Sequence, residues 1–234
     1  MVESPSSVED PQRARSSTYD SRRGLTHAKP VWRGMLHLIW FELSLVAGTA
    51  LVLRVDGTAR TVSAAIYVAS VSGLFGVSAL YHRGTWRPPA HRVLQRLDHA
   101  MIFLLIAGTA TPVFLVATSG TVGVVLLCVM WSLTAVALAT HLCRMSAPER
   151  LVGGTYIALG CIGIVALPFA LWHAGVAAFA LLVLGGVLYI LGAVLYHLRR
   201  PDPRPTVFGF HEVFHAFVCA AASAHFVAVA IVLT

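Results

Sequence analysis

Residues 175–197 read GVAAFALLVLGGVLYILGAVLYH, a run of 23 residues without Asp, Glu, Lys or Arg. A helix needs roughly 20 apolar residues to cross a hydrocarbon core of about 30 Å. Inside lipid the backbone polar groups must bond to one another, so such a run predicts a helix and not a strand. Six further apolar stretches predict six more spans, at 34–53, 62–82, 98–117, 121–142, 151–172 and 209–233. The predicted fold class is therefore all-α: a polytopic membrane protein built as a seven-transmembrane helix bundle.

The composition of the whole chain supports this class. Hydrophobic residues make up 57% of the chain and charged residues only 12%, whereas soluble domains carry about 25% charged residues. So few polar groups cannot cover a water-exposed surface, which excludes a soluble enzyme, an acidic disordered protein and a disulfide-rich secreted domain. The four cysteines form no C-x-x-C pair and lie in or beside apolar stretches, which is typical of thiols used in packing.

The basic residues lie in the gaps between the apolar stretches. Although the net charge is +7, Lys and Arg do not form a stripe along one face, so we expect no nucleic-acid partner. Fifteen of the seventeen fall on one side of the predicted spans, against only Arg54 and Arg60 on the other. The positive-inside bias then predicts a cytoplasmic N-terminus, an external C-terminus and a multi-pass protein of the cell membrane.

Residues 1–29 differ in composition from the rest of the chain. They are rich in Ser, Arg, Pro and Asp, with few apolar residues and no run resembling a signal peptide, so the first span is expected to direct insertion. We predict a disordered basic cytoplasmic tail at 1–29 and a seven-helix transmembrane domain at 30–234. Membrane lipids are the expected partners, and the oligomeric state stays open.

Ionisable residues inside the predicted spans indicate a functional site. Ser78 and His82 are four residues apart near the end of the second span, and His211 and His215 repeat this spacing at the start of the seventh. Two imidazoles so spaced on a helix can converge on one metal ion. The predicted orientation places both groups and Asp98, at the start of the third span, in one cytoplasmic layer. Three protein ligands with an open position are typical of catalytic zinc.

Two other interpretations of these residues stay open. Histidines near a membrane interface can simply bond to lipid headgroups, and His37 is interpreted in this way. Residues 211–215, HEVFH, also match the H-E-x-x-H protease pattern, but the chain has no soluble domain to hold a peptide. Glu212 is either a general base or a carboxylate at a helix terminus.

Two further ionisable residues in the spans have no role in this predicted site. His225 lies ten residues deeper than His215 and is expected to be packed or hydrogen-bonded inside the bundle. Glu42, in the first span, is expected to pair with a histidine of a neighbouring helix or to hydrogen-bond inside the bundle.

Four segments of the chain resemble the haemolysin III branch of the PAQR (progestin and adipoQ receptor) family. They are KPVWRG at 29–34 with His37, SALYH at 78–82, Asp98 followed by AGTATP at 107–112, and HEVFH at 211–215. The resemblance covers the chain from about residue 29 to its end. It implies a seven-helix bundle with a cytoplasm-facing Zn²⁺ site held by His82, His211 and His215. It also implies that Asp98 binds the water molecule on the zinc and that Ser78 lies next to these residues without binding the zinc itself. Asp98 and Ser78 would form the catalytic pair.

The function that this resemblance implies is membrane lipid homeostasis, with zinc-dependent hydrolysis of a lipid amide or ester, as in a ceramidase, as the leading mechanism. The alternatives are a non-enzymatic membrane sensor or regulator, or a cytolysin, with a structural zinc. An intramembrane metalloprotease is less favoured. A pore is disfavoured because the outer halves of the predicted spans are almost wholly apolar.

Overall fold

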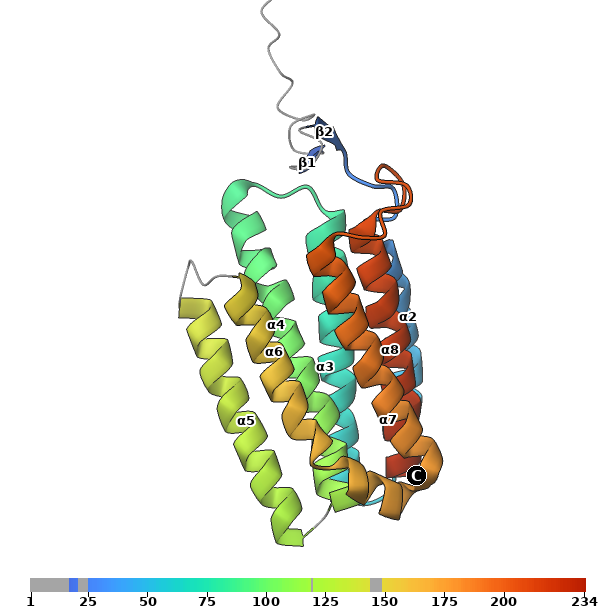
Figure 1. The fold of residues 1–234 in the computed structure, drawn as a ribbon. Helices are drawn as coiled ribbons and strands as arrows, with labels where there is room; N and C mark the ends of the chain where they lie inside the picture. Colours follow the sequence, from blue (N-terminus) through green and yellow to red (C-terminus); the bar gives the residue numbers. More distant parts are fainter. Residues whose placement is uncertain (1–16, 21–24, 119, 144–148) are drawn as a thin grey trace, which may run out of the picture.

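A computed structural model describes residues 17–20, 25–118, 120–143 and 149–234. These residues form seven helices that lie side by side in one bundle (Figure 1). The helices are α2 (Met35–Arg54), α3 (Thr58–Arg83), α4 (Pro88–Pro112), α5 (Gly120–Cys143), α6 (Glu149–Ile164), α7 (Leu167–Leu198) and α8 (Phe210–Leu233). Outside the bundle, β1 (Ser17–Asp20) pairs antiparallel with β2 (Leu25–Ala28).

The helices have the length and apolarity of membrane spans. Six of the described helices can each cross a membrane, and α6 adds a shorter apolar stretch at Val152–Ile164. The prediction of an all-α polytopic membrane bundle is confirmed. The direction in which the bundle crosses the membrane stays a prediction, as does the division of the chain at residue 29.

The helix boundaries differ from the predicted spans at two places. The third span was predicted from residue 98, but α4 begins ten residues earlier, with Pro88 and Pro89 in its first turn, where proline is favoured. The predicted fifth span, 151–172, runs past the end of α6: α6 stops at Ile164, and α7 begins at Leu167. The chain is apolar throughout this turn, so hydropathy carries no sign of it. The helix α7 is itself kinked at Gly175, where the sixth span was predicted to begin.

Proline also reshapes the far end of α4. Pro112 is the last residue of α4, and the chain continues as the π-helix η1 (Val113–Thr118). A proline has no backbone N–H and its ring clashes with the preceding turn, so the regular α-helical bonding is interrupted here. The wider π-helix lets the span continue to residue 118.

Buried side chains form two clusters within the bundle. One is centred on α3 and α8 and contains Tyr67, Phe75 and Val229. The other joins α4 and η1 to α5 and the turn before α7, and contains Phe114 and Met130. Apolar side chains on the outer faces are exposed, such as Val46 and Leu53 on α2, as expected where lipid tails cover a surface.

Candidate metal centre

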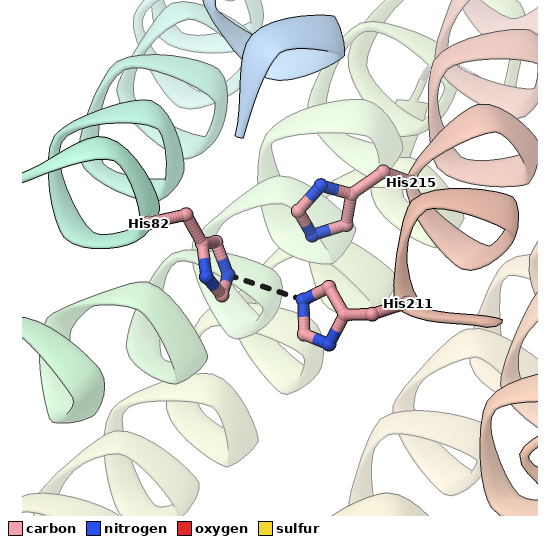
Figure 2. A group of neighbouring side chains, drawn as sticks. All are labelled: His82, His211 and His215. Carbon is pink, nitrogen blue, oxygen red and sulfur yellow. Dashed lines mark hydrogen bonds between the residues drawn. The ribbon is translucent and has the colours of Figure 1, made fainter. Parts of the chain in front are cut away.

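Three histidines meet between α3 and α8. His82 lies in the last turn of α3, and His211 and His215 lie in the first two turns of α8. One nitrogen from each ring lies within 4.8 Å of the other two. Figure 2 shows the three rings turned toward one another, with His82 Nε2 and His211 Nε2 3.3 Å apart. The structure thus brings together the three residues that the sequence proposed as ligands.

The geometry of this triad fits a metal ion. Two nitrogens bound at 2.0–2.1 Å to a tetrahedral ion lie about 3.3 Å apart, which is the spacing that His82 and His211 have. His82 and His215 are buried and His211 is half-buried, so the donor atoms are held away from bulk water. Imidazole nitrogen suits zinc, copper, iron and nickel. The triad can therefore hold a metal of this class.

Asp98 and Ser78 lie beside the triad. Asp98 Oδ2 is 3.7 Å from His82 Nε2, and the Ser78 side chain hydrogen-bonds to Asp98. Ser78 is buried on α3, four residues before His82, so both side chains lie on one face of that helix. All five predicted site residues are thus neighbours, while the catalytic roles assigned to Asp98 and Ser78 stay predictions.

A sixth residue, His37 of α2, belongs to the same group. Its ring stacks on His215, with centroids 3.8 Å apart, and meets Phe75 edge-on. His37 is buried, and neither of its nitrogens has a hydrogen-bond partner among the described residues. The prediction that His37 is an interface histidine bonded to lipid headgroups is wrong, because its ring is buried against His215. The predicted orientation could have indicated its place, because it puts the start of the first span, which carries His37, in the same layer of the membrane as the triad.

The triad lies on the wall of a large, partly open cavity of the bundle. The cavity measures about 2200 Å³, and its wall includes the triad, Ser78 and Asp98. Beyond the triad the wall is mostly apolar, with residues of α4, α6, α7 and α8, among them Ile106, Val187 and Val218. A cavity of this kind suits an apolar chain that ends in a polar group at the triad.

Comparison with known proteins places this bundle in a family. Residues 25–226 match the family described as Haemolysin-III related. The chain belongs to that family. It is 31% identical over 165 residues to the Hemolysin-3 homolog of Bacillus subtilis strain 168, covering 70% of this chain and 74% of that protein. Hemolysin-3 of Bacillus cereus is 31% identical over 188 residues, which are 78% of this chain and 81% of the relative.

A plant protein matches part of the chain as well. The heptahelical transmembrane protein ADIPOR2 of Oryza sativa subsp. japonica is 36% identical over 107 residues, covering 42% of this chain and 47% of that protein. The resemblance to the haemolysin III and PAQR proteins is therefore confirmed, and this haemolysin-III related chain is a multi-pass membrane protein.

In this haemolysin-III related protein, residues 29–34 form a strap across the end of the bundle that holds the triad. The strap pairs with the loop before α8, because Val31 N–H donates to Thr206 O and Trp32 N–H to Val207 O. Lys29 Nζ donates to the carbonyls of His82 and Gly84. Partial burial, together with the nearby Arg33 guanidinium, lowers the pKa of Lys29 from its usual 10.5.

Gly34 lets the strap pass close to the triad. It has a φ of 74°, and a Cβ atom at this position would lie 2.8 Å from the Cβ of His82. Glycine supplies both the left-handed backbone and the missing side chain. The strap therefore packs directly against a triad residue, at what we call the strap end of the bundle.

Glu212 anchors the strap to the start of α8. Arg33 Nε donates to its Oε1 at 2.5 Å, and the Gly209 N–H donates to its Oε2 at 2.8 Å. The Glu212 side chain is fully buried, so both oxygens are committed to these partners. Glu212 is thus the carboxylate at a helix terminus, and the protease interpretation loses its general base.

The predictions for two further ionisable residues of the spans, His225 and Glu42, have different outcomes. The ring of His225 is hydrogen-bonded through Nε2 to Leu182 O at 3.0 Å, which confirms the expected packed intramembrane histidine. The expectation for Glu42 is wrong, because its side chain is exposed on the outer face of α2. Helical periodicity placed Glu42 in a span but could not tell which face of that span the bundle covers.

Proposed function

We propose that this protein is a zinc-dependent hydrolase of a lipid amide or ester that acts in membrane lipid homeostasis. The observation that carries this proposal is the placement of the His82, His211 and His215 triad, with Asp98 beside it, on the wall of an apolar cavity. A site for soluble substrates has no use for such a cavity, whereas an acyl chain fills it.

The side chains of the site have distinct roles in this reaction. His82, His211 and His215 would hold the ion, which would supply the Lewis acidity that activates water and polarises a carbonyl. Asp98, through Oδ2, accepts the proton of the attacking water as general base. The Ser78 hydroxyl hydrogen-bonds to Asp98 and so fixes the orientation of its carboxylate. The apolar wall binds the acyl chain and excludes bulk water.

Zinc fits this proposal because a triad of neutral imidazoles with one open position is its usual catalytic arrangement. We further propose that the strap end faces the cytoplasm. Among the described residues, the loops at that end carry most of the arginines, including Arg83, Arg87 and Arg204, while only Arg54 and Arg60 lie at the opposite end.

The test compares three variants of the purified protein with the wild type for metal content and for turnover of lipid amides and esters. Asp98→Asn keeps its metal but loses about 100-fold or more in turnover, the usual contribution of a general base. His82→Ala loses both metal and turnover. His173→Ala, at an exposed position of α7, behaves as the wild type. Full turnover by a metal-free His82→Ala protein contradicts the proposal.

A second candidate is a non-enzymatic sensor or regulator in which the metal ties α3 to α8. It is supported by the strap, which contacts both helices near the triad. Zinc in structural sites contributes on the order of 10 kcal/mol, enough to hold two helices together. Cells in which Asp98→Asn retains metal and full function would favour this candidate. Lysis of red cells by the purified protein would instead favour the cytolytic role that the relatives' name hemolysin-3 suggests.

A further inference from the structure

The strap end of the cavity is strongly basic. Of the acidic residues in the described part of the chain, two aspartates, Asp98 and Asp202, and no glutamate line the cavity. The arginines on its wall come from the strap, from the start of α4 and from the end of α7, which all lie at this end of the bundle. They are Arg33, Arg92, Arg96, Arg199 and Arg200.

The protein neutralises only part of this charge. Arg33 pairs with Glu212. Asp202 uses Oδ1 to accept the Phe210 N–H. Arg92, Arg96 and Arg200 have no carboxylate partner in the part of the chain that the structure describes. Three guanidinium groups therefore remain available on the cavity wall at the strap end, where Arg92 and Arg200 are exposed, and we call this part of the wall the mouth of the cavity.

Membrane topology alone does not require arginines in this position. The positive-inside bias is satisfied by basic residues anywhere in the loops, and Arg83 and Arg87 lie at the same end without lining the cavity. Arg92 and Arg96 are instead one turn apart on α4, on the face that borders the cavity. Their side chains are placed where a ligand inside the cavity meets them.

The ligand that fits this mouth is an amphiphile with a phosphate group. Guanidinium groups match phosphate with paired, charge-assisted hydrogen bonds, and basic pockets between membrane helices bind anionic lipid headgroups. Behind the arginines the cavity is apolar, and at about 2200 Å³ it exceeds the roughly 300–1,000 Å³ of common ligand pockets. An acyl chain fits behind a phosphate bound at the mouth.

The spacing along α4 connects this mouth to the triad. Arg92 and Arg96 precede Asp98 by six and two residues, which is about 9 Å and about 3 Å along a helix axis. In a phospholipid the phosphate and the acyl ester are separated by only a few bonds. A phosphate at the arginines therefore brings the acyl linkage to Asp98 and His82.

We propose that Arg92, Arg96 and Arg200 bind the phosphate of a lipid and so make phosphate-bearing lipids the substrate class of this site. The position of the scissile bond rests on the proposed hydrolase function. The binding of the phosphate does not.

Binding is measured by calorimetry with the full chain in uncharged maltoside micelles, which removes any attraction to a charged membrane surface. The probes are dihexanoyl phosphatidic acid, dihexanoyl glycerol and inorganic phosphate. Wild-type protein binds the phosphatidic acid at least tenfold more tightly than the neutral diacylglycerol, and added salt reduces this preference. Inorganic phosphate binds at least tenfold more weakly than the phosphatidic acid, because it has no acyl chains.

The variants locate the phosphate. The double variant Arg92→Gln/Arg200→Gln loses the preference but keeps the affinity for dihexanoyl glycerol, which shows that it is folded. Arg87→Gln, an exposed arginine outside the cavity, keeps the preference. Equal affinity of the wild type for the two lipids, or an equal loss in Arg87→Gln, overturns the proposal. Inorganic phosphate that binds as tightly as the lipid assigns the arginines to a soluble anion and overturns the lipid assignment.

Measuring turnover together with binding distinguishes a failure of the phosphate site from a failure of the proposed hydrolase function. A wild-type protein that shows the binding preference but hydrolyses neither lipid refutes the hydrolase alone. A protein that hydrolyses neutral and phosphate-bearing lipids equally well, with equal affinities, refutes the phosphate site alone.

Discussion

The imidazole of His37 lies flat against the imidazole of His215, with ring centroids 3.8 Å apart and planes inclined by 14°. His37 belongs to α2, while the three predicted ligands belong to α3 and α8. Since Phe75 of α3 also contacts His37 edge-on, the ring of His215 rests on a support formed by two helices. The triad is thus oriented by packing as well as by its own backbone.

Replacing His37 tests this support. We expect His37→Ala to weaken metal binding roughly tenfold, the lower range seen when groups that orient a ligand are removed. His37→Phe restores most of the affinity, because a phenyl ring can still stack on His215. Competition with a chromophoric chelator measures both affinities. A His37→Ala protein with wild-type affinity would show that the stacking does not position His215.

Metal removal should destabilise the bundle. An ion present at 1,000 times its Kd stabilises a protein by about 4 kcal/mol, which corresponds to roughly 10 °C in Tm for a chain of this size. We expect a strong chelator to lower the Tm of the wild type by this amount and to leave that of His211→Ala unchanged. His197→Ala, at an exposed position near the end of α7, serves as the control. Equal chelator responses of wild type and His211→Ala would argue against a metal at the triad.

The Arg33–Glu212 pair should matter more for stability than an exposed charge does. The side chain of Glu212 is 1% exposed and that of Arg33 is 16% exposed. Removing one partner of a buried pair costs about 3–5 kcal/mol, because the other charge is left unpaired. We expect Arg33→Ala to lower the free energy of unfolding by about 3 kcal/mol, measured by denaturant titration in detergent.

A second substitution provides the control for that prediction. In Arg33→Ala/Glu212→Gln no buried charge is left, and the Gln oxygen can still accept the Gly209 N–H, so we expect part of the stability to return. Arg87→Ala, at an exposed position, changes stability by less than about 0.5 kcal/mol. A double variant no more stable than Arg33→Ala would mean that the charge of Glu212 is not the cause.

Substitution by alanine should change stability differently at two adjacent glycines of α7. A Cβ at Gly185 would lie 2.1 Å from the His225 ring, whereas a Cβ at Gly186 would meet no atom within 4 Å. Overpacking costs about 1–3 kcal/mol, so Gly185→Ala is expected to destabilise the protein. Gly186→Ala is expected to be neutral or to stabilise it by up to about 1 kcal/mol. Thermal unfolding of both variants checks the close contact of α7 with α8, and similar effects would contradict it.

Most of the candidate site could be predicted from the sequence because its ligands share helices. The spacing of His211 and His215 fixes two imidazoles on one face of α8, and Ser78 and His82 repeat this on α3. The distribution of basic residues over the loops predicted the orientation of the spans, and this orientation placed both pairs of residues in the same layer of the membrane. His37 has no partner on its own helix, so no spacing marked it, and only the packing of α2 against α3 and α8 brings it to His215.

The order of residues along the chain is enough to show that this protein is a membrane-spanning helical bundle and to show which histidines share a helix face. Both follow from local rules: the length of apolar runs and the 3.6-residue period. The tertiary structure alone decided that Glu42 lies on an outer face, that Arg33 reaches Glu212, and that arginines far apart in the chain line one cavity. These depend on how each helix is rotated about its axis. In an almost uniformly apolar chain that rotation is set by side-chain packing, which hydropathy does not record.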